Sequence, residues 1–286
     1  MAEATTATRP ERLPVPRRGT AMRWLLRGLK ATAPLIALAA LIGLWEILVI
    51  VLDVRPFILP KPSEIAVEIY DERAILIDAT GVTLLEVVLG FALSIVVAIP
   101  LAILIVYSSF FKNVFYPLLV TSQAIPRIAV APLVVLWFGF GILPKVLVAF
   151  SIAFFPLVVN TAIGLESTKR EIVYVVRSMG ASSLQTFMKA RFPSALPSIF
   201  GGLKVAIALS VIGAIVGEFV GASEGLGYLV IAAQGNLNTK LIFASITLMA
   251  IMGIVLFYII ELVERMVIGW HYAARAMEEG GGLDEE

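Results

Sequence analysis

Long apolar runs recur along this chain, and each is close to the length that crosses a lipid bilayer. A helix needs about 20 predominantly apolar residues to span a hydrocarbon core of ~30 Å. Only 15% of the 286 residues are charged, against roughly a quarter in ordinary soluble domains. The sequence therefore predicts an all-α, polytopic membrane bundle of about six transmembrane helices. The expected spans are 34–52, 82–107, 117–138, 144–165, 203–221 and 241–264.

The segments between and beyond these runs predict the domain organisation. Residues 1–30 are rich in Ala, Thr, Pro and Arg, so we expect a disordered tail that runs into a short interfacial helix at 22–30. The first transmembrane helix is expected within 31–54 and the main transmembrane core within 76–265. Residues 266–286 are expected to form a second tail.

The distribution of basic residues predicts the orientation. With the N-terminus inside, the inner segments carry fifteen Lys and Arg residues and the outer segments carry four. Positive charge concentrates on the cytoplasmic side, so both termini and the loop 166–200 are expected in the cytoplasm. The loop 53–80 holds six acidic residues and is expected outside, where Ser63 would cap an amphipathic helix that runs to Asp78.

Several kinds of chemistry lack the residues that they need. The chain has no Cys, and its one His, His271, lies beyond the last span. A buried Ser–His pair therefore has no base, and no metal-ligand cluster lies within the spans. The phosphate-binding pattern Gly-x-x-x-x-Gly-Lys-[Ser/Thr] is also absent. The sequence predicts a protein that is not an enzyme and that has no cofactor or metal; nothing in a net charge of +1 points to nucleic acid.

Ionisable residues inside apolar runs are candidates for function, because burying a charge in a membrane is costly. Glu86 and Lys204 lie near the ends of expected spans, where a long side chain reaches the interface, and Glu46 lies in the first span. Arg127 and Glu218 lie deeper. For these two a role in a translocation path and a simple interfacial position both stand open; Asn160 is the third candidate for the path.

Prolines and glycines within the runs are typical of a closely packed bundle. Proline frees backbone groups that neighbouring helices or a cavity must satisfy, and small residues let helices approach closely. The prolines are Pro100, Pro126, Pro132 and Pro156, and the glycines are Gly139, Gly141, Gly213, Gly217 and Gly221.

Residues 166–200 form a polar, basic segment with helical periodicity. An apolar face recurs at helical spacing and is followed by Gly180, which is typical of a helix C-terminus. Ser182 is expected to cap a second helix, Leu184 to Arg191, which Pro193 and Pro197 would stop. The pattern favours a helix–turn–helix elbow that docks a soluble partner, although a loop that only packs on the bundle fits it as well. The apolar face comprises Ile172, Val175, Val176 and Met179.

The spacing from Gly180 to Pro193 resembles the coupling loop, or EAA motif, of binding-protein-dependent ABC-importer permeases. The family pattern is Glu-Ala-Ala, three residues, Gly, nine residues, Ile-x-Leu-Pro. Here Tyr174, Val175 and Val176 replace the first three residues, and Ala190 and Phe192 replace the apolar pair.

Further motifs are similar to the nitrate/sulfonate/taurine branch of this family, which includes permeases for thiamine-precursor pyrimidines and riboflavin. They are Ala131-Pro-Leu-Val-Val-Leu-Trp-Phe-Gly-Phe-Gly141, Phe155-Pro-Leu-Val-Val-Asn160, Ser194-Ala-Leu-Pro-Ser-Ile-Phe-Gly-Gly-Leu203, and Gly217-Glu-Phe followed by Gly225-Leu-Gly-Tyr228. The resemblance covers about residues 55–270.

The resemblance implies a type I ABC importer permease with the MetI-like fold, in the inner cell membrane. It implies a homodimeric pore, separate ATPase subunits that hydrolyse ATP, and a periplasmic or lipid-anchored solute-binding protein. A stand-alone channel or secondary carrier is the alternative function, and the sequence does not identify the substrate. The coupling-loop residues implied are Gly180, Ala181, Ser182, Phe187, Pro193 and Pro197.

Overall fold

The computed structural model describes the backbone of residues 20–269 and the side chains of residue 33 and residues 35–269. This part of the chain is helical and contains no strand. The rest of the predicted N-terminal tail, residues 1–19, and most of the predicted C-terminal tail, with His271, lie outside it. The chain divides into two units, Met1–Val54 and Arg55–Glu286.

The first unit is described by one helix, α1 (Thr20–Val51). The expected interfacial helix at 22–30 and the expected first span are therefore parts of the same helix. Its described apolar segment, Leu35–Val51, lies within the expected first span.

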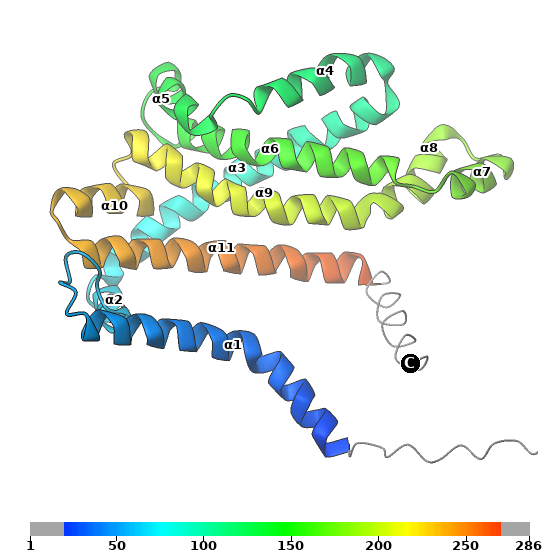
Figure 1. Cartoon of the computed structure of the whole chain (residues 1–286). Coiled ribbons are helices and arrows are strands. Elements are labelled where there is room, and N and C mark those ends of the chain that lie inside the picture. The colour runs from blue at the N-terminus through cyan, green and yellow to red at the C-terminus, as the bar shows by residue number, and fades with distance from the viewer. Residues whose placement is uncertain (1–19, 270–286) are drawn as a thin grey trace, which may run out of the picture. The chain divides into compact units, whose positions relative to one another are not determined.

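The second unit holds the other helices, in which α6 and α9 pack against each other along the bundle (Figure 1). Their bounds are α2 (Pro62–Asp71), α3 (Arg73–Tyr107), α4 (Ser109–Ser122), α5 (Arg127–Phe138), α6 (Ile142–Glu166), α7 (Arg170–Ser178), α8 (Ser183–Thr186), the π-helix η1 (Phe187–Arg191), α9 (Phe192–Gly221), α10 (Leu226–Gly235) and α11 (Thr239–Val267).

Four helices of the described chain are long and apolar enough to cross a membrane. They are α3, α6, α11 and the continuous helical stretch Ser183–Gly221. They match four of the expected spans. The expected span 117–138 is wrong as a single helix, because α4 and α5 meet at an angle of 100°.

The break between α4 and α5 lies at Pro126, whose backbone is extended with ψ 104°. Proline disfavours helical geometry at the residue before it and offers no N–H to a helix. Hydropathy alone does not reveal this bend, because the two helices taken together are apolar enough to pass as one span.

The amphipathic segment expected at 63–78 is divided at Glu72. Its first part is α2, which begins with Pro62 in the first turn and has Lys61 rather than Ser63 at the N-cap. Proline suits this first position because a backbone N–H there would have no acceptor within the helix. The second part belongs to α3, so the helix of the second span begins nine residues earlier than expected.

Glycines bring α3 and α9 into close contact with α6 at Ala149. A Cβ built on Gly90 of α3 would lie 2.5 Å from Ala149 Cβ, and one on Gly213 of α9 would lie 2.5 Å from Ala149 Cα. Gly217 approaches Lys145 in the same way, which confirms close packing at these glycines. Gly139 and Gly141 were expected to do the same, but they have open space around them and positive φ angles, so they shape a turn.

Candidate functional site

Helix α7 ends in a hydrogen-bonded turn that requires glycine. Gly180 has φ +83°, a conformation that costs other residues free energy. Its N–H donates to Arg177 O at 2.9 Å, and the N–H of Ala181 donates to Val176 O at 3.3 Å. This pair of bonds is the Schellman motif, and it confirms the helix end predicted at Gly180.

Helix α8 begins with a capping box. The Ser182 hydroxyl accepts from the N–H of Gln185 at 3.2 Å, and the Gln185 side chain accepts from the N–H of Ser182 at 2.8 Å. The two bonds satisfy donors that a helix N-terminus leaves open. The cap predicted at Ser182 is confirmed, and α7 and α8 are joined by a short, well-defined turn.

The second helix of the elbow does not stop at Pro193 or Pro197, so that expectation is wrong. Residues Phe187–Arg191 widen into a π-helical turn, and Pro193 follows in the first turn of α9, while Pro197 lies inside this helix. The wide turn moves the hydrogen bonds to the i→i+5 pattern, and a proline in a first turn loses no bond. The elbow therefore continues directly into a long helix of the bundle.

Aromatic side chains fix the elbow to the bundle. Phe187 meets Tyr107, at the end of α3, edge to face with ring centroids 5.7 Å apart, and it also contacts Phe192. Phe187 packs on the buried residues Leu165, Ala195 and Ile199. Phe187 thus faces the bundle rather than the outer surface of the elbow.

The outer surface of the elbow is apolar and has no partner within the described chain. Met179 is 82% exposed and Leu184 is 71% exposed, at either side of the Gly180 turn. Ile172, Val175 and Met188 are exposed beside them. In Figure 1 the elbow lies at the end of the bundle opposite α10. Exposed apolar patches of this kind mark contact surfaces.

Arg127 lies at the break between α4 and α5. Its Nη1 donates to Ile152 O of α6 at 2.8 Å, and its guanidinium lies 5.8 Å from the centre of the Phe155 ring. A cavity of about 450 Å³ is lined by Gln123, Arg127, Phe155 and neighbouring apolar residues. The arrangement places a cation, an amide and an aromatic ring around one hollow.

Glu218 forms the centre of a buried polar cluster, which we call the latch and define as Thr83, Glu218, Leu226 and Gly227. The Thr83 hydroxyl donates to Glu218 Oε1 at 2.6 Å and accepts from the N–H of Leu226 at 2.9 Å. The N–H of Gly227 donates to Glu218 Oε2 at 2.5 Å. Glu218 is only 2% exposed, so within this chain its carboxylate ties α9, α3 and the start of α10 together.

Asn160, the third candidate for the path, makes a local contact. Its Nδ2 donates to Pro156 O at 2.8 Å, one turn earlier in α6. Its Cβ also lies where a side chain on Gly202 would otherwise be.

Glu86 and Lys145 form a buried ion pair that the sequence analysis missed. Lys145 Nζ donates to Glu86 Oε1 at 2.7 Å, and both side chains are almost completely buried. The expected interfacial position of Glu86 is wrong, because α3 begins at Arg73 and carries Glu86 into the bundle. Lys204, for which the same was expected, pairs with Glu264 of α11.

The signals for these partners are weak in the sequence. Lys145 begins an apolar run and resembles a span flank, and Thr83 is a common residue in membrane helices. Among the described residues, no group of three or more His, Cys, Asp or Glu side chains is placed to hold a metal ion.

Comparison with known proteins matches residues 90–268 to the family described as binding-protein-dependent transport system inner membrane component. The formylaminopyrimidine transport permease protein ThiX of Halalkalibacterium halodurans is 38% identical over 85% of this chain and 98% of its own. The riboflavin transport system permease protein RibX of Chloroflexus aurantiacus is 35% identical over 86% and 91%. The taurine transport system permease protein TauC of Escherichia coli is 26% identical over 87% and 93%.

A solved structure of the MetNI methionine ABC transporter in inward-facing conformations shares the fold. One of its chains matches with a TM-score of 0.56 and 19% identity, over 69% of this chain and 98% of that chain. The match confirms the predicted all-α, MetI-like architecture.

Proposed function

Because this chain belongs to the family of binding-protein-dependent transport system inner membrane components, and so is a permease subunit of an ABC importer, we propose that its elbow docks an ATPase subunit. The contact would extend over residues 169–197, including Gly180, Ala181, Ser182 and the turn that they form. The chain itself is a multi-pass protein of the inner membrane and supplies the path for the solute.

The observation that carries this proposal is the apolar outer surface of the elbow. Met179 and Leu184 are the most exposed of its apolar side chains, and they stand on a turn whose backbone is fixed from both sides. The Schellman motif holds the end of α7, and the capping box holds the start of α8. A rigid apolar projection of this kind suits a groove on a soluble partner.

The test replaces Gly180 with Val. We expect the variant to fold but to co-purify less ATPase, because a β-branched residue at φ +83° costs roughly 1–2 kcal/mol and displaces the apolar side chains on either side. The matched control is Gly201→Val, which introduces the same side chain at a helical glycine with open space around it. Each permease variant is purified together with its ATPase, and the measurement is the number of ATPase subunits recovered per permease chain.

Wild-type stoichiometry and normal transport with Gly180→Val would sink the proposal. Equal loss in Gly180→Val and Gly201→Val would point to a general effect on the bundle and would also count against the elbow.

We propose that two copies of the chain form the pore, with residues 76–265 as the transmembrane core of each. The hollow at Arg127 and Phe155 opens on the surface of one copy, so a second copy would convert it into part of an enclosed path. Gly217 and Gly221 do not support the dimer, because both already pack against residues of their own chain.

We propose that the end of the bundle with α2 and α10 faces outward and receives the solute-binding protein, with both termini in the cytoplasm. Two contacts join α2 to the start of α11: Nδ2 of Asn238, the N-cap residue of α11, donates to Glu68 Oε1 at 3.1 Å, and Lys240 Nζ lies 3.8 Å from Glu64 Oε2.

For the substrate, we propose a small nitrogen heterocycle rather than a sulfonate. The two more similar of the three relatives named above carry a pyrimidine or a flavin by name. The hollow at Arg127 pairs a guanidinium with the Phe155 ring and the Gln123 amide, groups that suit a planar, polar ring. The ligand retained by the purified partner binding protein decides this; retention of taurine or another sulfonate would overturn it.

A further inference from the structure

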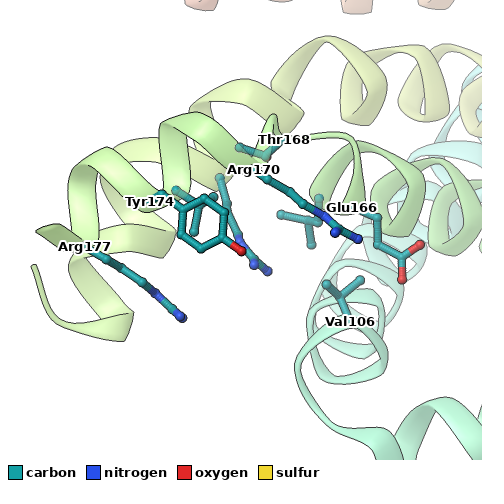
Figure 2. Close-up of a pocket in the computed structure, with 9 residues that line it drawn as sticks. Val106, Glu166, Thr168, Arg170, Tyr174 and Arg177 are labelled. Carbon is teal, nitrogen blue, oxygen red and sulfur yellow. The ribbon is translucent and has the colours of Figure 1, made fainter.

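A second hollow of this molecule lies beneath the elbow, on the side of α7 that faces the bundle. Its volume is about 520 Å³. Figure 2 shows Arg170, Tyr174 and Arg177 extending from α7, with Glu166 beside the end of Arg170 and Val106 below it. Its walls thus come from the ends of α3 and α6, from α7 and from the π-helical turn. The apolar outer surface that carries the proposed ATPase contact does not line this hollow.

Positive charge dominates the hollow. Arg170, Arg177 and Arg191 line it, against a single carboxylate, Glu166. That carboxylate is already paired with Lys112, at 3.0 Å. Among the described residues, none of the three arginines forms an ion pair. Three like charges around one hollow repel each other, and the attraction of an anion bound among them would offset that repulsion.

The hollow also contains a hydroxyl without a partner. Thr168 Oγ1 is buried and has no hydrogen-bond partner among the described residues, and Thr168 lines the hollow. A buried hydroxyl without a partner costs free energy. A ligand oxygen that accepts from Thr168 would remove that cost.

Helix α7 presents different residues on its two sides. At about 100° per residue, Arg170, Val173, Tyr174 and Arg177 share one side. The apolar residues of the outer surface, among them Ile172, Val175 and Met179, share the opposite side. The basic side therefore remains available when the apolar side is covered by a partner.

The hollow lies where two apolar helices end. Val106 is one residue before the end of α3, and Leu165 is one residue before the end of α6. Tyr107 is the last residue of α3, and the centre of its ring lies 5.2 Å from the Arg191 guanidinium. Arginine and tyrosine at the end of an apolar helix are typical of the level of lipid headgroups.

We propose that this hollow binds the phosphate headgroup of an anionic phospholipid from the leaflet that faces the elbow. Arginine guanidinium groups bind phosphate through paired, charge-assisted hydrogen bonds, and basic pockets between transmembrane helices hold anionic headgroups. Val106, Leu165 and Val173 add an apolar wall beside the arginines, which suits an amphiphile better than a freely diffusing ion. The lipid would brace the elbow from beneath.

The experiment uses the full-length permease in detergent. Native mass spectrometry measures which lipid stays bound, and the thermal unfolding midpoint measures how much each lipid stabilises the protein. The probes are phosphatidylglycerol, phosphatidylcholine and inorganic phosphate. We expect phosphatidylglycerol to be retained and to raise the midpoint, with phosphatidylcholine and phosphate far weaker. Arg170→Gln and Arg191→Gln should each lower the preference for phosphatidylglycerol roughly fivefold or more.

Each variant has a charge-matched control close by in the sequence. Lys169→Gln and Lys189→Gln remove the same charge from exposed residues that do not line the hollow, and we expect both to keep the wild-type preference. Arg191→Lys keeps the charge without the paired donors and should retain an intermediate preference. It also serves as the readout if Arg191→Gln does not fold.

Three results would overturn the proposal. An equal loss of phosphatidylglycerol preference in the arginine variants and the lysine controls would show that the lipid is attracted by the overall positive charge of this surface and not by the hollow. Full competition by inorganic phosphate would assign the hollow to a free anion. Unchanged lipid preference together with lost ATPase co-purification in the arginine variants would assign these residues to the ATPase. Failure of the elbow to bind ATPase would leave the lipid measurement unaffected, because the permease is tested alone.

Discussion

Glu218 joins three segments that lie far apart in the sequence, through both oxygens of its carboxylate. One oxygen accepts from Thr83, 135 residues away, and the other accepts from the backbone of Gly227. The surroundings leave no spare room, because a Cβ on Gly225 would lie 2.1 Å from Glu218 Oε1. The glycines near this carboxylate therefore belong to the latch as much as the polar residues do.

We predict that Gly225→Ala destabilises the bundle. The new methyl group would displace the Glu218 carboxylate, and Gly225 has φ +107°, a strain of roughly 1–3 kcal/mol for other residues. The control is Gly235→Ala, at the last residue of α10, with no atom within 4 Å of its added Cβ. The measurement is the thermal unfolding midpoint in detergent; equal midpoints for the two variants would contradict a tight latch.

The sequence could mark Glu218 but not the latch. A carboxylate in an apolar run is conspicuous, because an isolated charge there is costly. Its main partner, however, is a threonine on a different helix, and no local pattern encodes a pairing over 135 residues. The same holds for Glu86, whose partner Lys145 lies on another helix.

Local signals were sufficient for the end of α7 and the start of α8, and insufficient for the bent span. Gly180 and Ser182 act through bonds to neighbours within five residues, so sequence reasoning identified both. The bend between α4 and α5 depends on how the two halves pack, although Pro126 marks its position. The π-helical turn that lets the helix pass Pro193 is likewise decided by packing around Phe187.

Three helices meet at Ala149, and this junction allows a sharp test. We predict that Gly90→Ala and Gly213→Ala each destabilise the bundle by about 1–3 kcal/mol, because both overfill a packed core. The two variants differ in the atom that the new methyl group would contact. In Gly90→Ala this atom is Ala149 Cβ, and in Gly213→Ala it is Ala149 Cα. Adding Ala149→Gly should therefore relieve the first and not the second.

Two double-mutant cycles measure this difference as an interaction free energy. We expect a favourable interaction between Gly90→Ala and Ala149→Gly, and almost none between Gly213→Ala and Ala149→Gly. Equal interaction free energies in the two cycles would mean that the helices shift apart instead of keeping their contact.

At the scale of the whole molecule, we predict that the elbow and α2 lie on opposite sides of the membrane. The chain has no natural Cys, so single cysteines report their own position. Val67→Cys and Met179→Cys place thiols at exposed sites of α2 and the elbow. An impermeant thiol reagent should label the first in intact cells without ATPase or binding protein, and the second only after permeabilisation. Labelling in the reverse order would refute the orientation.

We predict that the active complex contains two permease chains. In the proposed contact each chain offers one elbow to one ATPase subunit, so a complex with two ATPase subunits would need two permease chains. The mass of the complex purified with its ATPase should fit two chains of each kind. A mass that fits one permease chain for two ATPase chains, with transport retained in proteoliposomes, would overturn the dimer.

Helix α9 runs for 30 residues without interruption, which makes it roughly 45 Å long. One of its ends emerges from the π-helical turn of the elbow, and the other carries Glu218. The helix therefore connects the proposed ATPase contact at one end to the latch at the other. A tilt of about 5° over this length displaces one end by about 4 Å relative to the other. A rigid tilt of α9 would therefore move the proposed ATPase contact and the latch together.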